Sequence, residues 1–376
     1  MNIAFVLLTY APDAPAGLER STAALMAGLR ELGHDVIMLT AARNAGHDDP
    51  ALIGIDIPLP FPATEEDLLA ALADPAPVQA RVREVLTRHR TDLACWADAS
   101  WGLGYLAPAP PGTRTVLKVA VLRTDPLFGQ ALAAGPDRVI TNSEFLISHA
   151  AGAGLDVTGW AVVPNALLTT AEPPPPDRRE ELRRRGPVRI AVRAEPHKGI
   201  AELIAAIPPG LGRDVEIALA AAGFEYWPGM QHQVIAGCAA AARAAPARVR
   251  LLPALGWRDV PGFLAGGAVT IISTTSPESW CNAAAEALSA GTPVIGYDFG
   301  HVPVLTGPAG LMVTAGEPPE ALWAAAARLL ADPGAYHAAA TAAPRQVRPH
   351  TPAAAAAAFL RAVTGTPASR TVTEDP

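Results

Sequence analysis

The sequence predicts an α/β protein made of two Rossmann-like, doubly wound domains with parallel sheets. Its 376 residues, of which 50% are hydrophobic, exceed what one ordinary core accommodates. Short apolar runs alternate with helical patterns in both halves of the chain, as in parallel sheets with crossover helices. Residues 172–185, with four consecutive prolines and many charges, have linker composition. We therefore expect one domain over residues 1–175 and another over residues 187–350.

Charge and cysteine usage narrow the classes of function. The net charge of −7 argues against a nucleic-acid binder. The three cysteines have no metal-ligand spacing and suit a reducing compartment. No apolar run is long enough to span a bilayer, and the first residues lead into a strand rather than a signal peptide. We expect a cytoplasmic protein that needs no cofactor.

The first half opens with a βαβ unit. An apolar strand at residues 3–9 is followed by a loop at 10–17 and a helix with leucines at spacings of four and three. Gly33 ends this helix, and the next strand covers residues 36–39. Such units are right-handed and place the loop at the carboxyl edge of the sheet.

The remaining elements follow from the same patterns. In the first half we expect strands at 52–57, 93–96 and 115–121 and a helix at 78–89. In the second half we expect strands at 189–192, 215–219, 249–252, 269–272 and 293–297, and helices at 200–207, 231–244, 259–265, 319–330 and 353–363. The loop at 97–111 carries Trp101 and Tyr105, which can stack on a sugar-like ligand or anchor the loop.

The most informative stretch runs from Ser276 to Gly291, S-P-E-S-W-C-N-A-A-A-E-A-L-S-A-G, between two apolar strands. Its alanine-rich part has strong helix propensity. The free N–H groups at residues 280–283, where this helix starts, form a site for a phosphate. Glu278 before the helix can bind sugar hydroxyls, and Glu286 inside it can bind the two hydroxyls of a ribose. Isolated glutamates here would more often be solvated and favoured by the helix dipole.

Two cations follow the first strand of the second domain. Arg193 and Lys198 stand between the strand at 189–192 and the helix at 200–207. Two cations at the carboxyl end of a strand can hold a diphosphate and stabilise it as a leaving group. The sequence contains no Asp-x-Asp pair, so we expect no divalent metal at the diphosphate.

These motifs resemble those of retaining glycosyltransferases of the GT-B fold, specifically family 4, the group 1 type. The segment Glu278–Glu286 is similar to the family's Glu–seven residues–Glu motif, and Arg193 with Lys198 to its Arg…Lys-Gly pair. The resemblance implies two domains facing a central cleft, with a last helix at 351–364 crossing back to the first domain. We expect the tail at 365–376 to be disordered.

The implied reaction moves a hexose-type sugar from a nucleoside-diphosphate sugar to an acceptor hydroxyl with retention. A UDP-sugar is the expected donor. The acceptor is unknown: a small-molecule or natural-product acceptor fits as well as a lipid, so membrane contact stays open although nothing indicates it. The resemblance implies Arg193, Lys198 and Glu278 as catalytic residues. The implied donor-binding residues are Gly17, Trp280, Cys281, Asn282, Ala283 and Glu286.

The chain departs from the family pattern at three places, of which the first is Val304, where the family often has glutamate. Cys281 stands where the family usually has glycine, and no histidine ends the strand at 115–121 beside the donor sugar. Lys118, Arg123 and Asp125 are candidates for the place of that histidine, and none is assigned. Two alternatives therefore stay open: a nucleotide-sugar epimerase on the same fold, and a non-catalytic paralogue that binds nucleotide-sugars.

Overall fold

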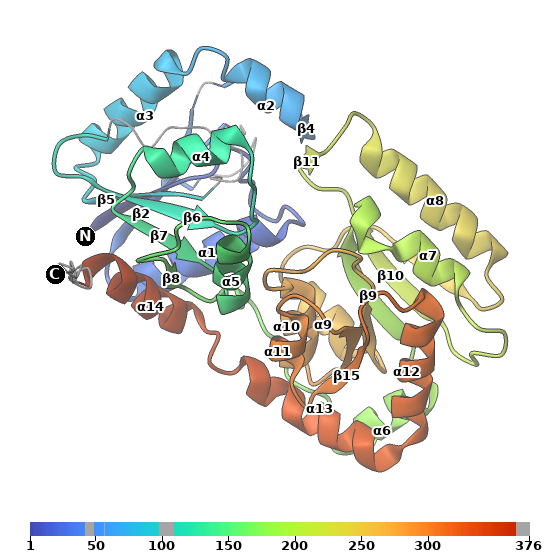
Figure 1. Cartoon of the computed structure of the whole chain (residues 1–376). Coiled ribbons are helices and arrows are strands. Elements are labelled where there is room, and N and C mark those ends of the chain that lie inside the picture. The colour runs from blue at the N-terminus through green and yellow to red at the C-terminus, as the bar shows by residue number, and fades with distance from the viewer. Residues whose placement is uncertain (42–48, 56, 98–108, 366–376) are drawn as a thin grey trace, which may run out of the picture.

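Two α/β domains lie side by side in the computed structural model, which describes residues 1–41, 49–55, 57–97 and 109–365 (Figure 1). The loop with Trp101 and Tyr105 and the tail at 366–376 lie outside these ranges. Within them, every helix is too short or too polar to cross a membrane.

The first domain is a seven-stranded sheet in which all pairings are parallel. In spatial order its strands are β3 (Leu52–Gly54), β2 (Asp35–Thr40), β1 (Asn2–Val6), β5 (Leu93–Trp96), β6 (Arg114–Val119), β7 (Arg138–Thr141) and β8 (Ala161–Val162). Its helices are α1 (Gly17–Glu31), α2 (Glu65–Ala71), α3 (Ala76–Arg88), α4 (Pro126–Ala133) and α5 (Glu144–Gly152).

The central strand shows why these apolar runs fold as strands covered on both faces. Alternate side chains of a strand point to opposite faces. Phe5 packs in one cluster with Leu25 of α1, whereas Val6 packs on the opposite face with Val85 of α3. The centroid of the Phe5 ring lies 5.9 Å from that of Phe359, in the last helix. Both faces of β1 are therefore buried, as the run of consecutive apolar residues predicts.

The second domain contains two three-stranded parallel sheets, which an isolated parallel bridge between Val188 and Val269 joins into one layer. Its strands run in the order β12 (Val249–Leu252), β10 (Val215–Ala220), β9 (Val188–Arg193), β13 (Thr270–Ile272), β14 (Val294–Tyr297) and β15 (Gly310–Val313). A hydrogen bond connects β9 to the residue before β13: the Arg189 N–H donates to the Val269 carbonyl at 3.1 Å. The prediction of two doubly wound parallel sheets is confirmed.

Helices cover both faces of this second sheet. They are α6 (Pro176–Arg185), α7 (Ile200–Ala205), α8 (Met230–Ala244), α9 (Val260–Ala265), α10 (Asn282–Ser289), α11 (Val302–Thr306), α12 (Pro319–Ala331) and α13 (Pro333–Val347). Leu203 of α7 and Trp323 of α12 pack on one face. Leu264 of α9 and Leu288 of α10 pack on the other.

The segment with linker composition differs from expectation, because residues 176–185 form α6. Arg179 of this helix is buried, and its guanidinium donates to the carbonyls of Gly267 and Ala290, both at 2.9 Å. His337 of α13 lies 2.9 Å from Glu180. Helix α6 is thus part of the second domain. The linker between the two domains consists of the residues that precede α6.

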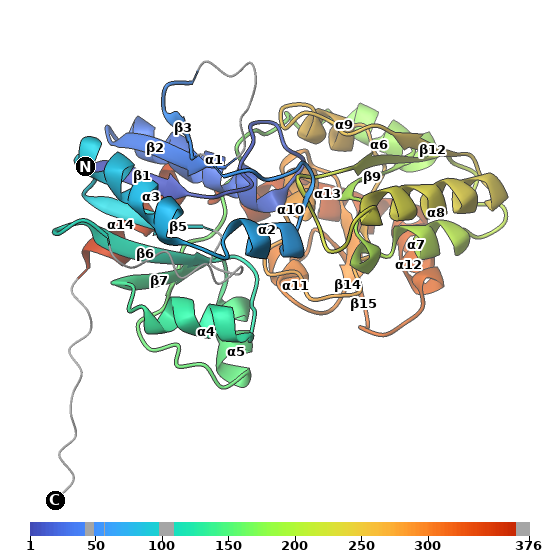
Figure 2. The same cartoon turned by 90° about the horizontal axis from the view of Figure 1, so that it is seen from above.

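Two further segments join the domains. Helix α14 (Pro352–Thr364) leaves the second domain and packs on α1 of the first (Figure 1). Strand β4 (Ala63–Thr64) of the first domain pairs in parallel with β11 (Phe224–Glu225) of the second. Seen from above, the loops around α1 and α10 meet between the two sheets (Figure 2).

Candidate active site

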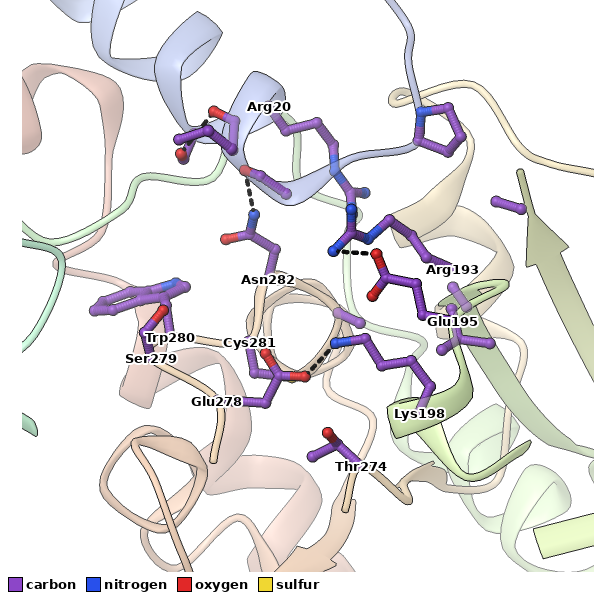
Figure 3. Close-up of a pocket in the computed structure, with 18 of the residues that line it drawn as sticks. Arg20, Arg193, Glu195, Lys198, Thr274, Glu278, Ser279, Trp280, Cys281 and Asn282 are labelled. Carbon is purple, nitrogen blue, oxygen red and sulfur yellow. Dashed lines mark hydrogen bonds and ion pairs between the residues drawn. The ribbon is translucent and has the colours of Figure 1, made fainter. Parts of the chain in front are cut away.

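A cavity of about 560 Å³ lies where the two domains meet. Its volume falls within the usual range for ligand pockets. The first domain lines it with the start of α1 and the loops after β6 and β7. The second domain lines it with the ends of β9 and β13 and the start of α10 (Figure 3). These are carboxyl ends of parallel strands, where ligands bind in α/β proteins.

Lys198 and Glu278, two of the predicted catalytic residues, lie together in the cavity. Lys198 Nζ is 2.5 Å from Glu278 Oε1, and both side chains are mostly buried (Figure 3). Arg193, the third, lines the same cavity, with its Nη2 2.8 Å from Glu195 Oε1. The structure thus brings the two cations of one loop and the first glutamate of the helix motif to one place.

Glu195 is a site residue that the sequence interpretation missed. Burial alone would raise its pKa, but the charges of Arg193 and Lys198 and the imidazole of His197 outweigh burial and lower the pKa to about 2. A buried, ionised carboxylate between these cations fixes the Arg193 side chain. The sequence does contain a feature that predicts Glu195 as a site residue, because it stands among three basic residues at the end of a strand.

The backbone conformation after Lys198 requires a glycine at position 199. Gly199 has φ +62°, and a Cβ there would lie 2.7 Å from the Ser273 carbonyl oxygen. The turn allows the Lys198 carbonyl to accept from Ser273 Oγ at 2.7 Å, and the His197 carbonyl to accept from Thr275 N–H at 2.7 Å. The loop with Lys198 is therefore held against the end of β13, close to Glu278.

The N-terminus of α10 faces the cavity with an unusual residue in front of it. Cys281 adopts φ +76°, a left-handed conformation that favours glycine. The backbone at this position therefore has a conformation that glycine adopts more readily than cysteine does. Burial, reinforced by the charge of Glu278, raises the pKa of the Cys281 thiol to about 12. The thiol is therefore neutral beside the helix start, where Asn282 and Ala283 also line the cavity.

The first turn of α1 meets the first turn of α10. Asn282 Nδ2 donates to the Gly17 carbonyl at 2.8 Å, and Asn165 Nδ2 donates to Asn282 Oδ1 at 3.3 Å. A Cβ at Gly17 would lie 3.0 Å from Asn282 Nδ2. Because Gly17 has no side chain, the start of α1 can approach the start of α10 closely. The first domain therefore contacts the predicted phosphate site.

Trp280 and Ser279 fasten the loop before α10. The Trp280 ring stacks on His301 at 4.9 Å and meets His350 edge-on at 4.8 Å. Ser279 Oγ donates to the Ala120 carbonyl at 2.7 Å, across the domain boundary. Ser279 was not predicted, because its partner lies 159 residues away in the chain.

Glu286, predicted to bind a ribose, is placed differently from the other candidates. It is buried on the α10 face toward α1, and its Oε1 accepts from Arg20 Nη1 at 2.7 Å. Burial raises the pKa of Glu286, against the influence of Arg20. Arg20 lines the cavity, whereas the predicted ribose-binding residue Glu286 is not among the residues that line it. No local feature of the sequence identifies this pair.

Of the three candidates for the missing histidine, only Arg123 lines the cavity. Its Nη2 lies 2.6 Å from Glu65 Oε1. Asp125 caps α4 by accepting from the Phe128 N–H at 3.0 Å. Lys118 is buried under α1, where its Nζ lies 3.3 Å from Ser21 Oγ.

The burial of Lys118 lowers the stability of the fold by an amount that depends on pH. Burial lowers the pKa of Lys118 from 10.5 to about 8, although Cys95 and Glu19 oppose the shift. Because the folded pKa is depressed, the unfolded chain binds more protons between pH 8 and 10.5, and stability rises with pH across that window. Below pH 8 the cost to the free energy of folding is about 3 kcal/mol.

We therefore expect Lys118→Met to raise the thermal midpoint at pH 7 and to raise it less at pH 10. Thermal unfolding of both proteins at the two pH values checks this. A variant that is less stable at pH 7, or equally stabilised at both values, would contradict the assignment.

Comparison with known proteins agrees with this geometry. Residues 188–332 match the family model described as "Glycosyl transferases group 1", and residues 16–166 match "Glycosyl transferase 4-like domain". No curated protein matches the chain.

Several solved structures share the fold. The sucrose-phosphate synthase (tll1590) from Thermosynechococcus elongatus superimposes with a TM-score of 0.73 at 18% identity, covering 93% of this chain and 94% of that one. Anabaena Alr3699/HepE in complex with UDP-glucose gives a TM-score of 0.72 at 17% identity, covering 97% and 100%. AviGT4, a glycosyltransferase involved in avilamycin A biosynthesis, gives 0.57 at 21% identity, covering 96% of each chain.

The two family models together span most of the chain, each on one of the two Rossmann-like domains. The solved structures share this two-domain architecture over nearly their whole length. The chain therefore belongs to the group 1 glycosyltransferases and has the GT-B fold.

Proposed function

We propose that the protein transfers a sugar from a UDP-sugar to an acceptor hydroxyl with retention of anomeric configuration. The observation that carries the proposal is the convergence of Arg193 and Lys198 on the start of α10 inside one cavity. Two cations and a helix N-terminus suit a diphosphate that leaves. The Anabaena protein of the same fold is solved with UDP-glucose, which supports a uridine nucleotide.

In this mechanism the bond between the anomeric carbon and the diphosphate oxygen breaks as the acceptor oxygen attacks from the same face. The acceptor's proton passes to an oxygen of the leaving phosphate, and the products are the glycoside and UDP. Arg193 and Lys198 stabilise the charge that develops on the diphosphate. Glu278, oriented by Lys198, accepts hydrogen bonds from hydroxyls of the transferred sugar.

The acceptor side of the site is formed by the first domain and the β4–β11 junction. Tyr226 and Phe224 line the cavity there, with ring centroids 5.6 Å apart. Aromatic faces suit the apolar part of a small organic acceptor. We propose a small-molecule acceptor on this ground.

Donor identity is tested first by thermal stabilisation with UDP-, GDP-, ADP- and TDP-sugars. A ligand at a hundred times its dissociation constant adds about 2.7 kcal/mol of stability. We expect the UDP-sugars to give the largest shift. Stabilisation by none of the four classes would contradict the proposed function.

Activity is expected to survive exhaustive chelation, with an α-linked product from an α-linked donor. Within the described ranges, no group of three or more His, Cys, Asp or Glu side chains is placed to hold a metal ion. The fixed charges of Arg193 and Lys198 would act on the leaving group instead. NMR of the product formed with excess chelator measures both expectations. Loss of activity would contradict metal independence, and a β-linked product would contradict retention.

A further inference from the structure

Arg20 carries a positive charge from the first domain into the phosphate side of the site. It stands in the first turn of α1, and its guanidinium lines the cavity. Figure 3 shows Arg20 and Arg193 reaching toward the same part of the cavity from opposite domains. Arg193 also contributes electrostatically at Glu19, the neighbour of Arg20 in α1.

The contact between Arg20 and Glu286 leaves hydrogen-bonding capacity unused. Nη1 donates to Glu286 Oε1 at 2.7 Å, with the two side chains 15% and 7% exposed. Among the described residues, Arg20 Nε and Glu286 Oε2 are buried and have no hydrogen-bond partner. A guanidinium has five N–H donors arranged to meet two acceptor oxygens at once. A pair whose only role was to join the domains would be expected to satisfy these atoms.

A nucleoside diphosphate has the groups that this pair lacks. Its ribose hydroxyls can donate to the free oxygen of Glu286, and its phosphate oxygens can accept from the free N–H groups of Arg20. A like charge such as Arg193 nearby is unfavourable until an anion lies between the two guanidinium groups. The arrangement therefore fits a ligand with a diol next to a diphosphate.

We propose that Arg20 is a third cation for the donor's diphosphate, supplied by the first domain, and that it binds the phosphates while it orients Glu286 toward the ribose. This inference rests on the proposed function and adds to it a residue outside the recognised motifs. In consequence, the diphosphate is held from both domains, whereas the nucleoside is held by the second domain with Glu286.

The test compares UDP with uridine by calorimetry on the wild type and on Arg20→Gln. Glutamine keeps an N–H donor for Glu286 but removes the charge. We expect about tenfold or greater weakening for UDP and less than about threefold for uridine. Arg20→Lys, which keeps the charge, is expected to recover part of the UDP affinity. Thermal midpoints verify that each variant is folded.

The outcomes separate the two proposals. An equal loss for UDP and uridine would mean that Arg20 acts only through Glu286, and unchanged UDP affinity would mean that it does not meet the phosphates. Either result overturns the role of Arg20 and leaves the proposed function standing. A wild-type protein that binds neither UDP nor another nucleoside diphosphate would overturn both.

Discussion

Replacement of Lys198 or Arg193 by alanine is expected to lower turnover by about a hundredfold or more. Both cations line the cavity. Lys198 Nζ lies 2.5 Å from Glu278 Oε1, and Arg193 Nη2 lies 2.8 Å from Glu195 Oε1. Charge that develops on a leaving diphosphate is stabilised by groups already fixed in place, and neither variant can replace the lost charge. Steady-state rates with a UDP-sugar and an accepted acceptor measure the effect.

The matched control is Arg328→Ala. Arg328 is exposed on α12, outside the residues that line the cavity, so its loss should leave the rate unchanged. Because Arg193→Ala leaves the buried Glu195 without its main partner, thermal melts must accompany the rates. A loss of less than a few-fold in both single variants would show that the phosphates bind elsewhere.

Glu286→Ala is expected to weaken nucleotide binding by about 1.5–3 kcal/mol, which is about tenfold to a hundredfold. The expected cause is the loss of the hydrogen bonds that we propose between the Glu286 carboxylate and the ribose. The loss should appear equally for UDP and for uridine, because both contain the ribose. Calorimetric titration of both ligands checks this.

Glu320→Ala provides the control, since Glu320 is an exposed glutamate in the first turn of α12. It should bind UDP as the wild type does. Unchanged nucleotide affinity in folded Glu286→Ala would remove Glu286 from the donor site and leave it as the partner of Arg20.

Local sequence was sufficient for the parts of the molecule that depend on local physics. The alternation of apolar strands and helices predicted both sheets, because strands buried on both faces read as continuous apolar runs. Helix α10 followed from its alanines and the glycine after it, and the loop with Arg193 and Lys198 from its place behind a strand. These are features within about twenty residues of one another.

The remaining features depend on contacts between distant segments. Arg20 reads as an ordinary polar residue of an amphipathic helix, and its partner Glu286 lies 266 residues away. The composition of residues 176–185 predicts a linker, because prolines and charges usually stay in solvent, yet these residues form α6 and Arg179 is buried against carbonyls of the second domain. Of Lys118, Arg123 and Asp125, only Arg123 lines the cavity, because Lys118 is buried in β6 beneath α1 and Asp125 caps α4.

The distribution of primary amines has a practical consequence. The sequence contains only two lysines, Lys118 and Lys198. The first is sealed beneath α1, and the second stands in the cavity wall. Apart from the chain's amino terminus, Lys198 is thus the amine through which an acylating reagent reaches this protein. Its rate of modification provides a footprint of cavity occupancy that needs neither a labelled sugar nor knowledge of the acceptor.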